Sequence, residues 1–280
     1  MIEIYFTKMH GNGNDFIIID NRVSITKGID LSTFVKTICT RHFHIGADGV
    51  MLLERSDSNL ATMRYFNSDG SEGEMCGNGA RCFARYVYTK GLTKEQFSIQ
   101  TISGMYGASI IDDELVEISF PSYTIEEFSQ LNVEEKAMYF LTVGVPHVVF
   151  YDKDIDNYDA IKYEKLARKI RYNKELFPKG TNVNMVERIS EDKIYVRTYE
   201  RGVEEETYAC GTGAIASTLI TAAVEGVKSP VTVQMKGGEL IVRFSEKDGA
   251  FTNVTLTGKA KFVFEGRFHY NFNDIEGGIK

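Results

Sequence analysis

The sequence has little proline and little cysteine, and it lacks a long apolar run. Its four prolines and the absence of low-complexity segments leave no candidate for a flexible linker. Its four cysteines contain no C-x-x-C pair and do not form a disulfide framework, so we expect free thiols and a cytoplasmic protein. The longest strongly apolar stretch, 214–224, is broken by hydroxyl side chains and is too short to span a bilayer. We therefore expect no membrane partner.

The chain also lacks an excess of basic residues. Lysine and arginine number 32 against 39 acidic residues, which gives a net charge of −7, so we expect no nucleic-acid partner. Residues 1–5 show no basic region followed by an apolar core, and we expect no secretory signal. The 280 residues, 43% hydrophobic and 25% charged, are ordinary for a globular protein and suffice for one large domain or two smaller ones.

The same order of features occurs twice along the chain. Each half begins with a strand, a turn and a second strand, at 2–19 and at 138–150, the second turn lying at 144–147. Amphipathic helices follow at 31–38, behind Asp30 as a cap, and at 161–170, where Ile161 is expected on the apolar face. This order predicts an internal duplication. We place one domain at 1–122 and the other at 123–280, with the option that the last strand returns to the first domain.

Each half then contains a cysteine motif that leads into an apolar helix. The motifs are C-G-N-G-A at 76–80 and C-G-T-G-A at 210–214, and the helices end near Gly91 and Gly226. Residues 214–224 carry few charges, so this helix should be buried on nearly all sides. We predict an α+β fold of two pseudo-symmetric domains. Each is a curled mixed sheet around a central buried helix, with the active site in the cleft between the domains.

A cysteine at the start of a helix lies in a distinctive field. Unpaired N–H groups and the helix dipole favour negative charge there, so they stabilise a thiolate and can also bind a carboxylate. The alternative is that Cys76 and Cys210 are small core residues, as most free cysteines are. Their equivalent places in the two halves favour the functional interpretation. Cys39 and Cys82 lack this context, and we expect them in the core.

Two thiols in equivalent positions predict chemistry at a stereocentre. Inversion at a carbon needs a base on one face and an acid on the other. The α-proton of an amino acid is weakly acidic, so without an electron-sink cofactor the site must stabilise charge and exclude water. Two domains that close over the substrate would do so.

The motifs as a set resemble the diaminopimelate epimerase family. The matching stretches are 9–16 (MHGNGNDF), 46–49 (GADG), 66–72 (FNSDGSE), 76–82 (CGNGARC), 146–147 (PH), 200–202 (ERG) and 209–214 (ACGTGA). The resemblance implies epimerisation of LL- to meso-diaminopimelate in the lysine and peptidoglycan precursor pathway. It also implies a zwitterionic amino-acid substrate, no pyridoxal phosphate or other cofactor, no metal and a homodimer.

The resemblance also implies roles for individual residues. Cys76 and Cys210 would be the acid–base pair, with His147 polarising Cys76 and Glu200 polarising Cys210. The implied substrate-binding residues are Asn14, Asn67, Gly77, Asn78, Asn182, Arg201, Gly211 and Thr212. An arginine fork can hold a carboxylate through two hydrogen bonds, and asparagine both donates and accepts. The structural alternatives are a turn residue at Asn14, a turn cap at Asn182, a surface charge at Arg201 and a buried structural residue at His147.

The sequence departs from the family pattern at two places. The family often has Gly-Asn-Pro-His where this chain has Val145, which removes a polar contact for the far end of diaminopimelate. An epimerase-like racemase of another amino acid, such as histidine or lysine, is therefore the alternative function. The loop 202–209 is one residue longer than usual, and we interpret its run Glu204, Glu205 and Glu206 as solvated.

Other classes of protein fit less well. A cysteine phosphatase needs C-x5-R, but Arg81 is one position too close to Cys76. Residues 211–216 fit a dinucleotide-binding glycine motif loosely, but Lys236 ends the next strand where an acidic residue is needed. A metal site could be formed by His10, His42 and His44, the last two of which we expect on one side of a strand. No acid or thiol completes a recognisable set of ligands with them. A non-catalytic thiol protein is the remaining alternative, and it would exchange no α-proton.

Overall fold

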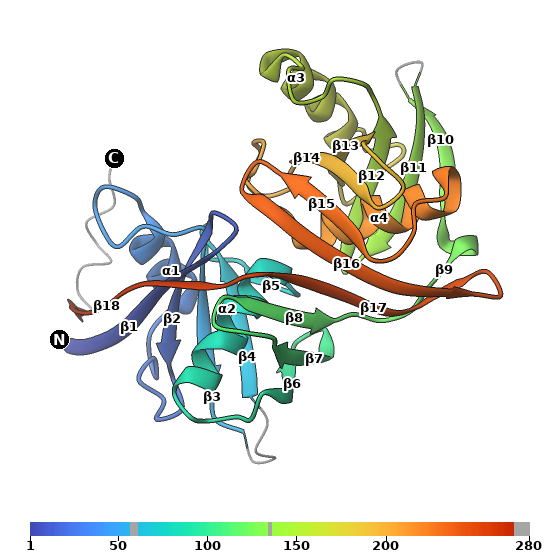
Figure 1. The fold of residues 1–280 in the computed structure, drawn as a ribbon. Coiled ribbons are helices and arrows are strands. Elements are labelled where there is room, and N and C mark those ends of the chain that lie inside the picture. The colour runs from blue at the N-terminus through green and yellow to red at the C-terminus, as the bar shows by residue number, and fades with distance from the viewer. Residues whose placement is uncertain (57–60, 134–135, 272–280) are drawn as a thin grey trace. The chain divides into compact units, whose positions relative to one another are not determined.

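The computed structural model describes residues 1–56, 61–133 and 136–271, and it divides into two compact units (Figure 1). The first unit contains Met1–Val116 together with the C-terminal stretch that begins at Ala260. The second unit contains Glu117–Lys259. The chain therefore passes into the second unit at 116–117 and returns to the first at 259–260.

The first unit is a mixed sheet against helix α2 (Figure 1). Its elements are β1 (Ile2–Gly11), β2 (Asn14–Asp20), α1 (Leu31–Cys39), β3 (Gly49–Glu54), β4 (Ala61–Asn67), β5 (Glu72–Gly73), α2 (Gly77–Thr89), β6 (Gln96–Thr101), β7 (Gly104–Ile110), β8 (Leu115–Ser119, which crosses the unit boundary) and β18 (Lys261–Tyr270). β1 pairs antiparallel with β2, β2 parallel with β3, and β3 antiparallel with β4. β4 pairs parallel with β6, and β6 antiparallel with β7. β18 adds to the free side of β1.

The second unit repeats this order of pairings around helix α4. Its elements are β9 (Tyr123–Thr124), the short 3-10 helix η1 (Ile125–Glu127), β10 (Ser129–Val133), β11 (Lys136–Val143), β12 (Val145–Tyr151), α3 (Ala160–Arg171), β13 (Asn182–Arg188), β14 (Lys193–Tyr199), α4 (Gly211–Glu225), β15 (Val231–Met235), β16 (Gly238–Lys247) and β17 (Ala250–Lys259). From β11 to β16 the successive pairings are antiparallel, parallel, antiparallel, parallel and antiparallel, as they are from β1 to β7. The repeated topology supports the predicted duplication.

The central helices are buried as their sequences predict. α4 is buried from Gly211 to Ala222 and packs against every strand from β11 to β17. α2 is buried from Gly77 to Val87 and lies against β1, β2, β4 and β7. Cys82 lies in this buried part of α2, as predicted. Among the helices of the described residues, none combines the length and the apolar character needed to cross a membrane.

The amphipathic helices are present, and one predicted member of an apolar face, Ile161, is wrong. Asp30 caps α1 by accepting the N–H of Ser32 at 3.2 Å, and Cys39 is buried with the apolar face of this helix, as predicted. In α3, however, Ile161 is 64% exposed, and the buried residues are Tyr163, Ala167 and Ile170. These three lie at i, i+4 and i+7, so they share one helix face that Ile161 does not.

The second strand–turn–strand is tighter than the sequence predicts. The predicted turn at 144–147 is wrong, because β12 begins at Val145 and includes Pro146 and His147. Gly144 alone connects β11 to β12, with φ of +69°, a conformation that favours glycine. This places His147 within the sheet rather than in a surface loop.

Candidate active site

Cys76 caps the N-terminus of α2 with its side chain. Its backbone is extended, and its Sγ accepts the N–H of Gly79 at 3.4 Å. The same sulfur lies 3.9 Å from Oδ1 of Asn14, to which the thiol donates. Because the side chain takes one of the unpaired N–H groups of the helix, negative charge on this sulfur is favoured.

Cys210 caps α4 in the same way. Its Sγ accepts the N–H of Gly213 at 3.4 Å and lies 3.6 Å from Oγ1 of Thr212. The backbone φ and ψ are −121° and 110°, against −130° and 112° at Cys76. Cys210 is buried, and Cys76 is half-buried. The two units thus present two sulfurs in one local geometry.

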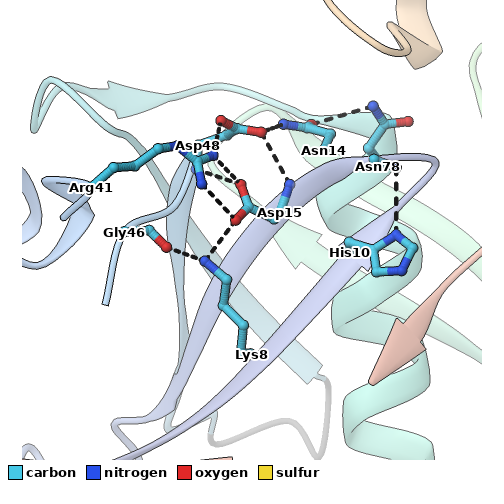
Figure 2. Close-up of polar contacts among 9 residues, drawn as sticks. Lys8, His10, Asn14, Asp15, Arg41, Gly46, Asp48 and Asn78 are labelled. Carbon is cyan, nitrogen blue, oxygen red and sulfur yellow. Dashed lines mark hydrogen bonds and ion pairs between the residues drawn. The ribbon is translucent and has the colours of Figure 1, made fainter. Parts of the chain in front are cut away.

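Asn14, which contacts the sulfur of Cys76, also belongs to a network of polar side chains that Figure 2 shows. Its Nδ2 donates to Oδ2 of Asp48 at 2.6 Å, and its Oδ1 accepts from Nδ2 of Asn78 at 3.3 Å. These two contacts orient the amide so that its carbonyl oxygen is the atom near the sulfur of Cys76. Asn14 is therefore more than a turn residue, although it also begins β2.

Charged side chains, of which Lys8 is buried and Arg41 is exposed, hold this network in place (Figure 2). Arg41 donates to Asp15 at 2.6 Å and to Asp48 at 2.8 Å, and Lys8 lies 2.8 Å from Asp15. Lys8 also donates to the carbonyl of Gly46. Burial alone would raise the pKa of Asp15, but the hydrogen bonds from Arg41 and Lys8 outweigh it and lower that pKa to about 2. Asp15 is therefore ionised at neutral pH and anchors the β1–β2 turn.

Arg81 is a buried residue to which the sequence analysis assigned no role in this site. Its Nη2 donates to Oδ1 of Asn78 and to Oδ1 of Asn12, both at 3.0 Å, and its Nη1 donates to the carbonyl of Gly77 at 3.2 Å. Burial lowers the pKa of Arg81 to about 10, which leaves it charged at neutral pH. It fixes the side chain of Asn78 at the start of α2.

Asn67 ends β4 in the turn 67–71. Its backbone N–H donates to the carbonyl of Ser71 at 2.9 Å, and its Nδ2 donates to Oγ of Ser71 at 3.1 Å. Its side chain is exposed. The structure thus supports a role for Asn67 in the turn, while its contact with a substrate stays a prediction.

His147 is fully buried in β12. Burial and the nearby charge of Arg201 together lower the pKa of His147 to about 3, so the imidazole is neutral at physiological pH. Its Nδ1 lies 3.2 Å from Nδ2 of Asn184. Its Nε2 is buried and has no hydrogen-bond partner within the described part of the chain. An unpartnered buried nitrogen requires an explanation beyond packing.

Asn182 and Arg201 are joined through the backbone. Oδ1 of Asn182 accepts the N–H of Arg201 at 2.7 Å, which is the capping role considered as its structural alternative. The guanidinium of Arg201 donates to the carbonyl of Lys179 at 3.2 Å through Nη1. Glu200, the residue before it, accepts from Oγ1 of Thr207 at 2.5 Å. Asn182 therefore sets the position of the arginine.

The acidic run in the loop 202–209 is not simply solvated. Glu206 receives two hydrogen bonds from Arg197, at 2.6 and 2.8 Å, and Glu204 receives two from Arg171, at 2.7 and 3.1 Å. Only Glu205 of the three is exposed. The interpretation of a solvated run is thus wrong for Glu204 and Glu206, because both lie partly buried against arginines.

The histidines considered as metal ligands do not form a cluster. His42 and His44 lie outside the strands in an exposed loop, where His42 has φ of +71°, so their expected place on one side of a strand is wrong. Within the described ranges, no group of three or more histidine, cysteine, aspartate or glutamate side chains lies close enough to hold a metal ion.

Known structures share this fold. A Bacillus anthracis phenazine biosynthesis protein of the PhzF family superposes with a TM-score of 0.72 and 16% identity, covering 96% of this chain and 100% of that one. A hydroxyproline epimerase from Agrobacterium vitis gives 0.70 and 14%, covering 95% and 92%. The predicted α+β fold of two similar halves is thereby confirmed. The comparison thus defines a fold class, and each unit of this chain presents a central helix that a cysteine caps.

Sequence comparison narrows this class to one family. Residues 6–121 and 139–263 match the family model for diaminopimelate epimerase. A diaminopimelate epimerase from Aquifex aeolicus (strain VF5) is 41% identical over 276 residues, which cover 94% of this chain and 96% of that protein. The chain belongs to the diaminopimelate epimerase family. It is therefore an isomerase with an amino-acid substrate, and the resemblance inferred from the motifs is confirmed.

Proposed function

We propose that this protein interconverts LL- and meso-diaminopimelate through a two-thiol mechanism. The observation that carries the proposal is the identical capping of α2 by Cys76 and of α4 by Cys210 in a chain of this family. The mechanism requires both sulfurs to reach one α-carbon, each on its own face. This requirement is part of the proposal.

The proposed step moves two protons and forms no covalent intermediate. One cysteine, as a thiolate, takes the α-proton, and the electron pair of the C–H bond passes into the α-carboxylate. The other cysteine, as a thiol, then delivers its proton to the opposite face of the carbon. The first sulfur leaves the cycle protonated and the second as a thiolate, so the reverse reaction runs with their roles exchanged.

The starts of the two helices would stabilise the charge that develops on the carboxylate. Backbone N–H groups at Gly77-Asn78 and Gly211-Thr212 lie in the first turns of α2 and α4, where anions bind. Arg201 would add a charged fork. Asn14, Asn67 and Asn182 would contact the amino and carboxylate groups, with the oriented carbonyl of Asn14 as an acceptor for the ammonium.

His147 and Glu200 would support the two sulfurs. We assign His147 to Cys76 and Glu200 to Cys210, as the family resemblance implies. Glu200 lies in the segment between β14 and Cys210 and is held by Thr207. The proposal includes a homodimer and no cofactor or metal, on the basis of the resemblance. It also includes a cytoplasmic protein with no nucleic-acid or membrane partner, on the basis of the composition and charge.

A substrate panel in D₂O tests the proposed function. We would incubate the purified protein with LL-diaminopimelate, meso-diaminopimelate, histidine and lysine, follow loss of the α-proton by NMR, and separate the stereoisomers by chiral chromatography. We expect deuterium at the α-carbon and inversion with diaminopimelate alone. Inversion of histidine or lysine in its place would favour the alternative that Val145 raises. If none of the four amino acids lost its α-proton to the solvent, the proposal would be contradicted.

A further inference from the structure

Three buried polar residues in the second unit occupy positions that are apolar in the first. In the second unit His147 pairs with Asn182 across β12 and β13, and Asn184 pairs with Thr198 across β13 and β14. In the first unit Phe16 pairs with Gly49, and Met51 pairs with Tyr65, across the corresponding strands. By this register, His147, Asn184 and Thr198 are equivalent to Phe16, Met51 and Tyr65.

The glycines of the cysteine motifs support this equivalence independently. A Cβ added to Gly79 would lie 3.2 Å from Sδ of Met51, and a Cβ added to Gly213 would lie 2.5 Å from Oδ1 of Asn184. Both central helices therefore begin against the same strand position. The fold accommodates methionine and aromatic rings in one unit, so the polar residues in the other unit are not required by the architecture.

The three polar side chains form one fully buried chain of hydrogen bonds. Oγ1 of Thr198 donates to Oδ1 of Asn184 at 2.9 Å. Nδ2 of Asn184 contacts the carbonyl oxygen of Val148 at 2.9 Å and Nδ1 of His147 at 3.2 Å. All three residues have 0% exposure. Buried networks of this kind restrict their members to one arrangement of donors and acceptors.

The carbonyl of Val148 determines where the proton of His147 lies. A carbonyl oxygen can only accept, so the atom of Asn184 that faces it must be the NH₂ group. The same NH₂ group faces Nδ1 of His147, which must then accept and carry no proton. Because burial keeps the imidazole neutral, its one N–H proton is on Nε2. This is the nitrogen that has no partner within the described residues.

We propose that Asn184, held by Thr198, is a positioning residue that fixes His147 with its proton on Nε2, so that His147 donates a hydrogen bond in the reaction and does not remove a proton. This inference rests on the proposed function for the identity of the acceptor, which is a thiolate sulfur or the substrate anion. A neutral donor at this place stabilises negative charge while leaving proton transfer to the two cysteines.

Nitrogen NMR of histidine tests the inference without any substrate. The chain has five histidines, so a protein labelled with ¹⁵N-histidine gives a small spectrum, in which H147Q assigns His147. At neutral pH we expect an unprotonated Nδ1 and a protonated Nε2 for His147. A proton on Nδ1, or a cationic ring, would overturn the proposal.

Variants of the two supporting residues provide the second arm. In N184D a carboxylate oxygen replaces the NH₂ group that faces Nδ1 of His147. A carboxylate accepts a hydrogen bond from Nδ1–H, so we expect the proton of His147 to move to Nδ1. T198V removes the hydroxyl that holds Asn184, and we expect a mixture of tautomers; T198S keeps the hydroxyl and should retain the wild-type spectrum. If N184D fails to fold, T198V against T198S decides. An unchanged tautomer in the folded variants would contradict the role of Asn184.

Kinetics separate positioning from substrate binding. We expect kcat of N184D for diaminopimelate to fall on the order of 10²-fold, as when other enzymes lose one preorganised hydrogen-bond donor to a developing anion, with a much smaller change in KM. T198S should retain kcat within about twofold. If N184D had a shifted tautomer but a wild-type kcat, the proposed role of His147 as a hydrogen-bond donor in the reaction would be overturned. The proposed function is tested separately, by the exchange of substrate α-protons that the wild-type protein catalyses in D₂O. The tautomer is measured without substrate, so the two proposals can fail independently.

Discussion

Arg197 holds Glu206 through two parallel hydrogen bonds, of 2.8 Å from Nε and 2.6 Å from Nη2. Nη1 of the same arginine donates to the carbonyls of Ile155 and Tyr158, at 2.9 and 2.7 Å. The arginine side chain is 7% exposed and that of Glu206 is 17% exposed, so the pair is largely shielded from water. The pair therefore ties the loop between Arg201 and Cys210 to the body of the second unit.

We predict that E206Q destabilises the protein. The change leaves the charge of Arg197 buried without its carboxylate, which typically costs several kcal/mol, and we expect a loss of about 2–4 kcal/mol in the free energy of unfolding. Urea unfolding measures this loss. E205Q is the matched control, because the neighbouring Glu205 is exposed, and it should change the free energy by less than about 0.5 kcal/mol. Equal effects of the two variants would contradict the anchoring role.

The pH dependence of stability should reveal the buried neutral His147. Burial lowers the pKa of His147 to about 3, from an ordinary value near 6.5 in the unfolded chain. Between these values the unfolded state binds a proton that the folded state does not, so stability falls as the pH drops from 6.5 towards 3. We expect H147Q to remove up to about 1.4 kcal/mol per pH unit from this slope. Urea unfolding at several pH values measures this slope. If the free energy of unfolding changed with pH in the same way for wild type and H147Q between pH 7 and 5, the assignment would be contradicted.

The close approach of Gly213 to Asn184 predicts unequal effects of two similar substitutions. In G213A the new methyl would lie 2.5 Å from Oδ1 of Asn184, a fixed and fully buried atom, so we expect a loss of about 1–3 kcal/mol in unfolding free energy. In G79A it would lie 3.2 Å from the flexible Met51, and alanine favours the helix by up to about 1 kcal/mol. G79A should therefore be the milder change in thermal unfolding. The reverse order would contradict the fixed position of Asn184 against Gly213.

We predict that R201K weakens substrate binding. A lysine cannot make the two parallel hydrogen bonds of a guanidinium, so KM for diaminopimelate should rise at least about tenfold while kcat changes less. The backbone N–H that Asn182 accepts is unaffected by this change. Arg188 bonds the backbone carbonyls of Ser190 and Glu225 at the surface, so R188K is the control and should leave KM unchanged. An unchanged KM in R201K would remove Arg201 from the site.

Features that repeat locally could be predicted from the sequence. The two cysteine motifs each contain a cap, a glycine whose N–H reaches the sulfur and an apolar helix, all within a few residues, and both predicted helix starts are confirmed. Asp30 at the start of α1 is a similar local signal. Periodicity alone did not show that Tyr163, and not Ile161, packs on the buried face of α3, because the hydroxyl of Tyr163 is held by two backbone carbonyls of the sheet.

Features that depend on strand pairing could not be predicted in this way. Asn184 and Thr198 are polar residues at buried positions of two strands, and that pattern is the only sequence signal of their network. Their contact with His147 requires the register of β12, β13 and β14. Similarly, nothing near Glu206 in the sequence indicates that Arg197, in the preceding strand, removes it from solvent.

The stereochemical outcome in D₂O with cysteine variants tests the two-thiol mechanism most directly. Wild type, C76A and C210A would each be incubated with LL-diaminopimelate, and inversion at the α-carbon would be followed by chiral chromatography. We predict that the wild type forms meso-diaminopimelate carrying deuterium at the inverted centre, and that neither alanine variant forms it. Inversion at the wild-type rate by either variant would contradict the mechanism.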